Sequence, residues 1–153
     1  MKINSIHKIS LPALLLLLVV VCESTKSTNL NTKETVSKIT MEKTTLGNSS
    51  VLEVNKKQVL TLSKEKNGEE NTRNSSTKPE HWQEINRLVS GLDMNEMSNW
   101  EAPTQARFYD GARATIITIE SDGQTFTSQS FDEGKPPAQL KKLYDYLESL
   151  VNQ

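Results

Sequence analysis

The sequence is poor in the residue types on which most catalytic and metal sites depend. Its 153 residues include one cysteine and two histidines, and only one of those histidines, His81, lies outside the first ten residues. A lone cysteine excludes a disulfide within the chain. No G-x-S-x-G turn, glycine-rich phosphate loop or metal-ligand cluster accompanies the histidine. We therefore expect no catalytic residues, no metal site and no cofactor.

Glycine, proline and excess charge are also scarce. Six glycines and five prolines are too few for a collagen-like or low-complexity chain. Lys and Arg total 18 against 19 Asp and Glu, which gives a formal net charge of −1. The composition therefore predicts no basic surface for nucleic acid. A chain of this length allows one compact domain.

The N-terminus has the composition of a secretory signal peptide. Lys2 and Lys8 precede an uncharged apolar run from residue 11 to residue 21. A membrane-spanning helix needs about 20 apolar residues, so this run is too short to be one. We expect residues 1–21 to direct export and to be removed.

Cys22 follows that run directly and resembles the cysteine of a bacterial lipobox. Val19 and Val20 supply the aliphatic residues of such a motif, whereas Val21 stands where Gly, Ala or Ser is usual. The resemblance implies that the Cys22 thiol receives a diacylglycerol and becomes the new N-terminus. The protein would then be lipid-anchored in the cell envelope, at the periplasmic or surface side of the outer membrane. The alternative is an ordinary signal peptide whose apolar run happens to end in cysteine.

The mature chain divides into a tether and a domain. Residues 22–37 are rich in Ser, Thr, Asn and Lys and have almost no apolar side chain, which predicts a flexible, lipid-anchored tether. Residues 38–153 form the expected single domain. Short alternating apolar runs at its start predict three strands, at residues 39–41, 51–54 and 59–62.

A polar loop expected over residues 63–76 is followed by the pattern of a helix start. Thr77 and Glu80 have the spacing of a capping box, with Thr77 as the N-cap and Glu80 at the third helical position. An apolar stripe at helical spacing follows, at Trp82, Ile85, Leu88 or Val89, and Leu92. These residues predict one amphipathic helix.

The C-terminal part of the chain predicts a hairpin and a second helix. Asp122 and Gly123 separate two β-rich runs, at 114–119 and 126–131, and Asp-Gly is typical of a type I′ hairpin turn. The complete order is βββαββα, which predicts an α+β domain: a small antiparallel sheet with two helices packed on one face. After two prolines the final helix has one apolar stripe, at Leu140, Leu143, Leu147, Leu150 and Val151.

Three stretches of the sequence contain distinctive motifs. Residues 102–112 (APTQARFYDGA) fit the pattern APTxxRxxDGA, residues 131–137 (FDEGKPP) fit FDxGxPP, and residues 78–82 (KPEHW) precede both. With these motifs the chain resembles a family of uncharacterised lipoproteins from Bacteroidetes, although Glu133 stands where that family usually has histidine. The resemblance implies a signal-anchored envelope protein without an assigned activity. A looser similarity, of layout alone, is to emfourin-type inhibitors of thermolysin-like proteases.

The two longer motifs contain the candidate binding residues. Asp110 and Asp132 each stand near a glycine, which favours turns; the alternative is a pair of carboxylates for acid–base chemistry or calcium binding. Phe108, Tyr109 and Phe131 are expected to cover the core and would indicate a contact surface if exposed. The candidate loop residues are Pro103, Arg107, Asp110, Gly111, Phe131, Asp132 and Gly134.

These observations favour a non-catalytic binding or interaction module of the cell envelope. Its partners would be the membrane, through the lipid anchor at Cys22, and an envelope protein. Two alternatives stay open. One is a protease inhibitor, which would need an exposed loop or edge strand to enter a protease cleft. The other is a hydrolase that uses Asp110 and Asp132.

We expect the mature protein to carry fatty acid on Cys22. Cells grown with a labelled fatty acid should incorporate the label into the protein, which should partition into detergent because several acyl chains give stable anchoring. The substitution Cys22→Ser should abolish the labelling and release or misprocess the protein. A mature N-terminus well beyond residue 22, without lipid mass, would contradict the prediction.

Overall fold

The computed structural model describes residues 36–151. The signal peptide expected over residues 1–21, the lipidation site Cys22 and nearly all of the expected tether lie outside the described residues. Strand β1 (Val36–Thr45) begins with a buried side chain, so residues 36 and 37 of the expected tether belong to this strand. Within the described residues no helix is long and apolar enough to cross a membrane.

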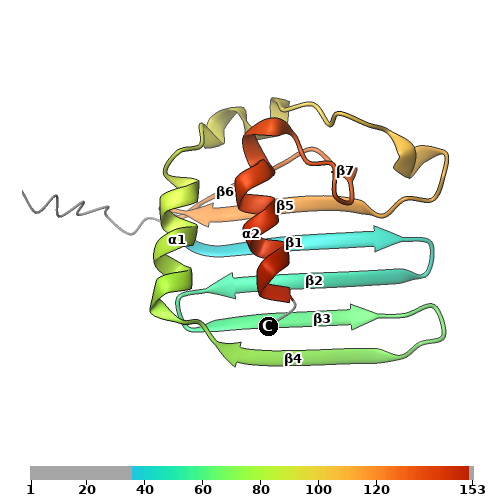
Figure 1. The fold of residues 1–153 in the computed structure, drawn as a ribbon, viewed down its shortest axis with the longest axis horizontal. Helices are drawn as coiled ribbons and strands as arrows, with labels where there is room; N and C mark the ends of the chain where they lie inside the picture. Colours follow the sequence, from blue (N-terminus) through green and yellow to red (C-terminus); the bar gives the residue numbers. More distant parts are fainter. Residues whose placement is uncertain (1–35, 152–153) are drawn as a thin grey trace, which may run out of the picture. The chain divides into compact units, whose positions relative to one another are not determined.

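Seven strands form one antiparallel sheet (Figure 1). After β1 they are β2 (Asn48–Asn55), β3 (Gln58–Lys64), β4 (Glu70–Ser76), β5 (Ala114–Ser121), β6 (Gln124–Thr127) and β7 (Phe131–Asp132). The strands lie in the order β4-β3-β2-β1-β5-β6, and the short β7 also pairs with β5. The central strand β1 pairs with β2 on one side and with β5 on the other.

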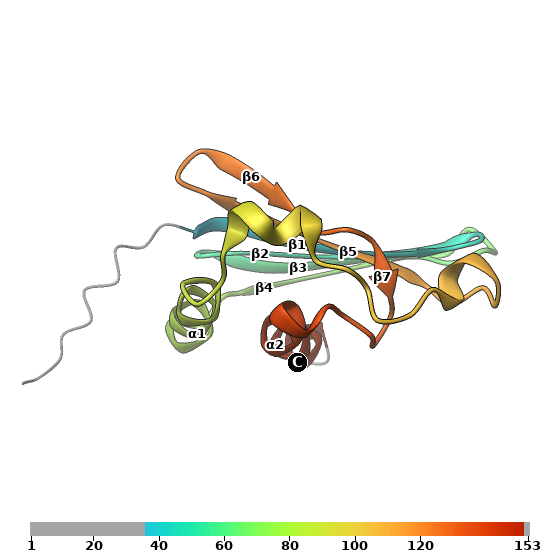
Figure 2. The ribbon, with the colours of Figure 1, turned by 90° about the horizontal axis from the view of Figure 1, so that it is seen from above.

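Two helices, α1 (Pro79–Val89) and α2 (Lys141–Val151), lie on the same side of the sheet in Figure 2. Three short 3₁₀ helices lie in the connections: η1 (Met94–Asn99), η2 (Ala106–Phe108) and η3 (Ala138–Leu140). The fold is therefore α+β with an antiparallel sheet, as the sequence predicts. The expected order βββαββα is wrong, because four strands precede α1 and three follow it.

The core lies between the sheet and the helices. Alternate residues of β1, β2 and β5 are buried because successive side chains of a strand point to opposite faces of a sheet. Each large aliphatic side chain that is removed from water contributes about 1.5–3 kcal/mol to folding. The core residues with an exposed fraction of 2% or less include Ile39, Met41, Leu52, Val54, Ile85, Ile117, Ile119, Leu143 and Leu147.

The hairpin between β5 and β6 has the predicted turn. Asp122 and Gly123 adopt φ angles of 49° and 75°, in the left-handed region that a type I′ turn requires at both positions. The second strand of the hairpin is shorter than expected. The N–H of Ser128 donates to the carbonyl oxygen of Ile117 at 2.9 Å, and the Ser128 Oγ accepts from the N–H of Ile117 at 3.0 Å. This side-chain bond ends the ladder, so the strand expected over 126–131 is divided into β6 and β7.

The polar stretch expected to form a loop over residues 63–76 instead contains β4. This strand pairs with β3 along its full length, from Gln58 opposite Ser76 to Lys64 opposite Glu70. Every β4 side chain is exposed, and none is apolar. Without a buried face β4 lacks the alternation by which strands are recognised in a sequence, so pairing with β3 determines it.

Thr77 does not cap α1. The N-cap is Lys78, which makes no side-chain capping bond. Thr77 is buried, and its Oγ1 donates to the carbonyl oxygen of Asn55 at 2.7 Å, while its N–H donates to the carbonyl oxygen of Lys57 at 3.1 Å. These bonds join the start of α1 to the turn between β2 and β3, which corrects the expected capping box.

We expect Thr77→Val to lower the free energy of unfolding by about 1 kcal/mol, because valine keeps the volume and loses the donor to Asn55. Glu80→Ala should change it by less than about 0.5 kcal/mol, because no side-chain bond caps the helix. Urea unfolding followed by circular dichroism measures both changes. A larger loss for Glu80→Ala than for Thr77→Val would restore the capping box.

Candidate functional site

The two motif loops meet at the carboxylate of Asp132, which ends β7 and is 3% exposed. Its Oδ2 accepts hydrogen bonds from Oγ1 of Thr104 at 2.6 Å and from the N–H of Ala106 at 2.7 Å. Its Oδ1 accepts from the N–H of Arg107 at 2.8 Å and from the guanidinium of Arg107 at 3.1 Å. One buried carboxylate therefore holds residues 104–107, and we call these residues together with Asp132 the carboxylate clasp.

Arg107 makes further bonds that close the clasp. Its Nη1 also donates to the carbonyl oxygen of Thr104 at 2.8 Å, and its Nε donates to Oγ of Ser130 at 3.1 Å. Burial by itself raises the pKa of the Asp132 carboxyl, but the hydrogen bonds from Thr104 and Arg107 outweigh it. They hold that pKa well below its usual range. The carboxyl group is therefore ionised throughout the physiological pH range.

The clasp holds a short turn that exposes two aromatic rings. Phe108 is 63% exposed and Tyr109 is 80% exposed. The rings meet edge to face with 6.4 Å between their centroids, and the Arg107 guanidinium lies 4.3 Å from the Phe108 centroid in a cation–π contact. Of the three aromatic residues expected to cover the core, only Phe131 is buried. The prediction was wrong for Phe108 and Tyr109 because the clasp fixes the path of their loop outside the core.

A third large apolar side chain is exposed at the same end of the sheet. Leu46, in the turn between β1 and β2, is 91% exposed. Its neighbour Thr45 donates from Oγ1 to the carbonyl oxygen of Gly111 at 3.2 Å, which ties this turn to the loop that follows η2. Figure 1 shows the β1–β2 turn and η2 at one end of the molecule. We call Leu46, Phe108 and Tyr109 the apolar tip.

Asp110 lies outside the clasp. Its N–H donates to the carbonyl oxygen of Ala106 at 2.7 Å, which closes a turn. Its side chain is exposed and bonds to no described residue. Asp110 and Asp132 thus do not form a bonded pair of carboxylates. Within residues 36–151 no three His, Cys, Asp or Glu side chains are placed to hold a metal ion.

The remaining candidate residues shape the two loops. Gly111 and Gly134 have φ angles of 67° and 77°, which glycine adopts without the steric penalty that a Cβ would bring. The N–H of Gly134 also donates to the hydroxyl of Tyr144 at 2.9 Å, which joins this loop to α2. Pro103 is exposed just before the clasp. These residues therefore set the path of the chain around the clasp.

Sequence reasoning missed a second charged cluster, on β1. Lys43 is 7% exposed, and its ammonium nitrogen lies 2.8 Å from the carboxylate of Glu133 and 2.6 Å from that of Glu148. The same nitrogen lies 6.0 Å from the ring centroid of Tyr144. Burial alone lowers the pKa of Lys43, but its hydrogen bonds to the two carboxylates raise that pKa above the ordinary value. Lys43 continues the buried alternation of β1, which is the pattern that could have revealed it.

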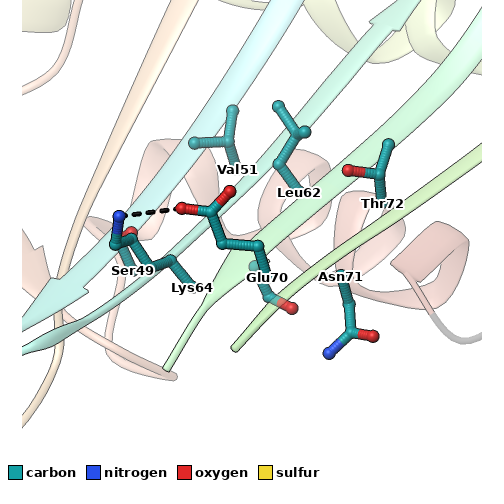
Figure 3. A pocket seen from close by; sticks show the side chains of 8 residues that line it. Ser49, Val51, Leu62, Lys64, Glu70, Asn71 and Thr72 are labelled. Atoms are coloured by element: carbon teal, nitrogen blue, oxygen red, sulfur yellow. Dashed lines mark hydrogen bonds and ion pairs between the residues drawn. The ribbon is translucent and has the colours of Figure 1, made fainter. Parts of the chain in front are cut away.

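Three surface hollows lie along β3 and β4. One of about 190 Å³ is lined by residues of β2, β3 and β4, including Lys64 and Glu70, whose side chains form an ion pair of 2.8 Å (Figure 3). Two others, of about 370 Å³ and 290 Å³, lie beside the end of α2 at Val151. None of the three is lined by a residue of the clasp or of the apolar tip.

No family model matches the chain, and neither does any curated protein with which it was compared. The resemblance to Bacteroidetes lipoproteins and the looser one to emfourin-type inhibitors therefore stay predictions. Export and lipid anchoring stay predictions as well. The clasp and the tip are defined by the distances and exposed fractions of residues 36–151 alone.

We expect Asp132→Asn to lower the melting temperature by about 5–10 °C. The reason is that an amide places an NH₂ group against donors, whereas the carboxylate accepts at both oxygens. Asp110→Asn is the matched control and should stay within about 1 °C, since that side chain makes no bond to a described residue. Differential scanning calorimetry measures both variants.

The same variants predict a response to acid. Because the folded-state pKa of Asp132 lies below its unfolded value of about 3.9, the stability it contributes is present above that pH. That stability is lost as the pH falls through the folded-state pKa. The difference in melting temperature between the unsubstituted chain and Asp132→Asn should be full at neutral pH and shrink below about pH 4. If the difference in melting temperature is the same at neutral pH and below about pH 4, the charge of Asp132 does not contribute as predicted.

Proposed function

We propose that the mature chain is a non-catalytic binding module, anchored in the cell envelope through a lipid on Cys22, and that the apolar tip is its contact surface. The clasp is the observation that carries this proposal. Residues of the two motif loops bond to one another, and the turn that they hold exposes aromatic rings. The hydrogen bonds of the carboxylate clasp thus hold Phe108 and Tyr109 of the apolar tip in exposed positions.

The state of the carboxylates agrees with binding better than with hydrolysis. A general acid or base works best with a pKa near the working pH, whereas the pKa of Asp132 is held far below it. Both oxygens of Asp132 already accept hydrogen bonds from the chain itself. Asp110 stands apart, exposed to solvent. A hydrolase that uses Asp110 and Asp132 therefore has no support from the geometry.

The apolar tip has the composition of a protein contact site. The exposed large hydrophobic residues among the described part of the chain are Leu46, Leu62, Phe108 and Tyr109, so three of these four lie in the tip. Scattered single apolar residues are normal on a surface, whereas a group of them marks an interaction site. Aromatic rings supply large contact areas and recur among the residues that dominate binding energy.

The position of the tip on the domain also suits a tethered binding module. The chain enters the sheet at Val36, and β1 then runs for ten residues towards the tip (Figure 1). At about 3.3 Å per residue, β1 spans about 33 Å. A tether joined at Val36 therefore leaves the tip far from its point of attachment.

A protease inhibitor is the second candidate function, and the exposed strand β4 favours it. An extended strand or loop is the part of an inhibitor that enters a protease cleft, and every β4 side chain is exposed. Such an inhibitor would block a thermolysin-like protease at stoichiometric amounts. A module that acts through the tip would not.

Photo-cross-linking in the native envelope tests the tip. We expect a photoreactive aromatic residue in place of Tyr109, which is 80% exposed, to form a discrete protein adduct. The same probe in place of the exposed Lys142 on α2 should form none. Phe108→Ser should reduce the adduct at position 109 by at least about tenfold. It should lower the melting temperature much less than Asp132→Asn does, because that ring is 63% exposed and loses only its contacts with Arg107 and Tyr109.

An adduct of equal yield at both positions, or none at position 109, would contradict the proposal. Stoichiometric inhibition of thermolysin by the full chain, unaffected by Phe108→Ser, would instead establish the second candidate function.

A further inference from the structure

The two edges of the sheet differ in what covers them. β6 lies against η1, and the side-chain amide of Gln129 donates to the carbonyl oxygen of Ser98 at 2.9 Å beside it. β4 pairs only with β3 among the described strands and borders the sheet on its other side (Figure 1). All seven of its side chains are exposed. Among residues 36–151, β4 is therefore a free edge of the sheet.

The pairing with β3 determines which backbone groups of β4 face outward. The ladder continues beyond both ends of β4. The N–H of Thr77 donates to the carbonyl oxygen of Lys57 at 3.1 Å, and the N–H of Glu65 donates to the carbonyl oxygen of Glu69 at 2.8 Å. In an antiparallel pair, hydrogen-bonded and non-hydrogen-bonded positions alternate. The pairs Lys57–Thr77 and Glu65–Glu69 are hydrogen-bonded, so every second pair between them is hydrogen-bonded as well. The residues of β4 that bond to β3 are therefore Asn71, Arg73 and Ser75. The N–H and C=O groups that point away from β3 belong to Glu70, Thr72, Asn74 and Ser76.

No described residue along β4 blocks the addition of another strand. Natural edges are commonly shielded by proline, by a bulge or by inward-pointing charges. β4 has no proline, and its register with β3 is unbroken. Its two charged residues are already engaged, Glu70 with Lys64 at 2.8 Å and Arg73 with the carbonyl oxygen of Val151 at 3.3 Å. A continuous edge of about 23 Å is left open.

The side chains of β4 other than Glu70 and Arg73 are short, and apolar surface lies within reach of an added strand. Arg73 itself lines the two hollows beside α2. On the side of α2, Val151 lines both the hollow of about 370 Å³ and that of about 290 Å³, and Leu150 lines the second. On the opposite face, the hollow of about 190 Å³ includes Val51 and Leu62 (Figure 3). In recognition by strand addition, main-chain bonds supply affinity and pockets for alternate side chains supply specificity. The edge has both.

We propose that the β4 edge is a second binding surface. It takes an extended segment of another polypeptide as an added strand, with aliphatic side chains at alternate positions that face α2. The outward backbone groups bond to the segment, and the hollows beside α2 receive its aliphatic side chains. This surface is separate from the apolar tip, so either can fail without the other.

A second copy of the chain fits this edge poorly. Only pairing about the central residue joins all seven residues of β4 with those of a second copy, and in that register Arg73 of one copy stands opposite Arg73 of the other. Like charges directly opposite each other in a sheet are destabilising. β4 also has no apolar side chain with which to fill the hollows. A foreign segment with aliphatic side chains satisfies both requirements.

Selection from a display library of random ten-residue linear peptides, with the full chain in detergent as the target, tests the inference. We expect the enriched peptides to carry aliphatic residues at alternate positions. When one of these peptides binds, hydrogen exchange at the N–H groups of Thr72 and Asn74 should slow by at least about tenfold. The N–H groups of Asn71 and Arg73, which bond to β3, should exchange slowly from the start.

Thr72→Pro and Thr72→Ala form a matched pair of variants. Proline removes an N–H that points away from β3, which an edge strand tolerates, so the fold should persist while the Kd of the peptide rises by at least about tenfold. Alanine keeps the N–H but trims a side chain that lines part of the hollows, so the Kd should rise far less than with proline. If Thr72→Pro does not fold, Asn74→Pro replaces it. The slowing of exchange at Thr72 and Asn74 in the unsubstituted chain on peptide binding tests the inference without either variant.

Several results would overturn the inference. They are the absence of any enriched peptide, binding that leaves exchange at Thr72 and Asn74 unchanged, and equal binding by Thr72→Pro. Slower exchange at these two residues on concentrating the chain alone would assign the edge to a second copy instead. Peptides whose binding is lost in Phe108→Ser but kept in Thr72→Pro would overturn this inference and support the tip.

Discussion

A buried carboxylate has to be met by hydrogen-bond donors, and at Asp132 the donors lie 25 to 28 residues earlier in the chain. An ionised group that is 3% exposed would destabilise the fold if it were unpaired. Residues 104–107 must therefore pass beside β7. Their bonds to Asp132 fix the position of η2 and hence of the aromatic residues Phe108 and Tyr109. The exposure of Phe108 and Tyr109 thus follows from where the chain has to go to satisfy one charge.

The part of the molecule that stabilises the fold and the surfaces proposed to bind partners lie in different places along the sheet. β1, β2 and β5 lie under the helices and supply most of the buried strand residues. The free edge at β4 and the apolar tip contribute little to that core, so changes there need not alter stability. Between core and surface, Lys43 is held by two carboxylates, a pairing that offsets the cost of burying its charge.

The elements that could be predicted from the sequence are those with local determinants. The turn at Asp122 and Gly123 and the apolar stripe of α2 each depend on residues within a few positions of one another. β4 could not be predicted, because it has no buried face and is ordered by the ladder that it forms with β3. Thr77 shows the limit of a local motif: the hydroxyl that matched a helix cap bonds instead to Asn55, 22 residues away.

By itself the sequence determined the antiparallel α+β class, the type I′ turn and the buried stripe of α2, because neighbouring residues decide these features. It also singled out Arg107 and Asp132 as residues of interest, without the bond between them. Only the tertiary structure decided that Asp132 closes a clasp, that Lys43 is buried between two carboxylates and that β4 is an open edge. Each of these depends on groups far apart in the chain, and the packing of the sheet and helices settles which of them meet.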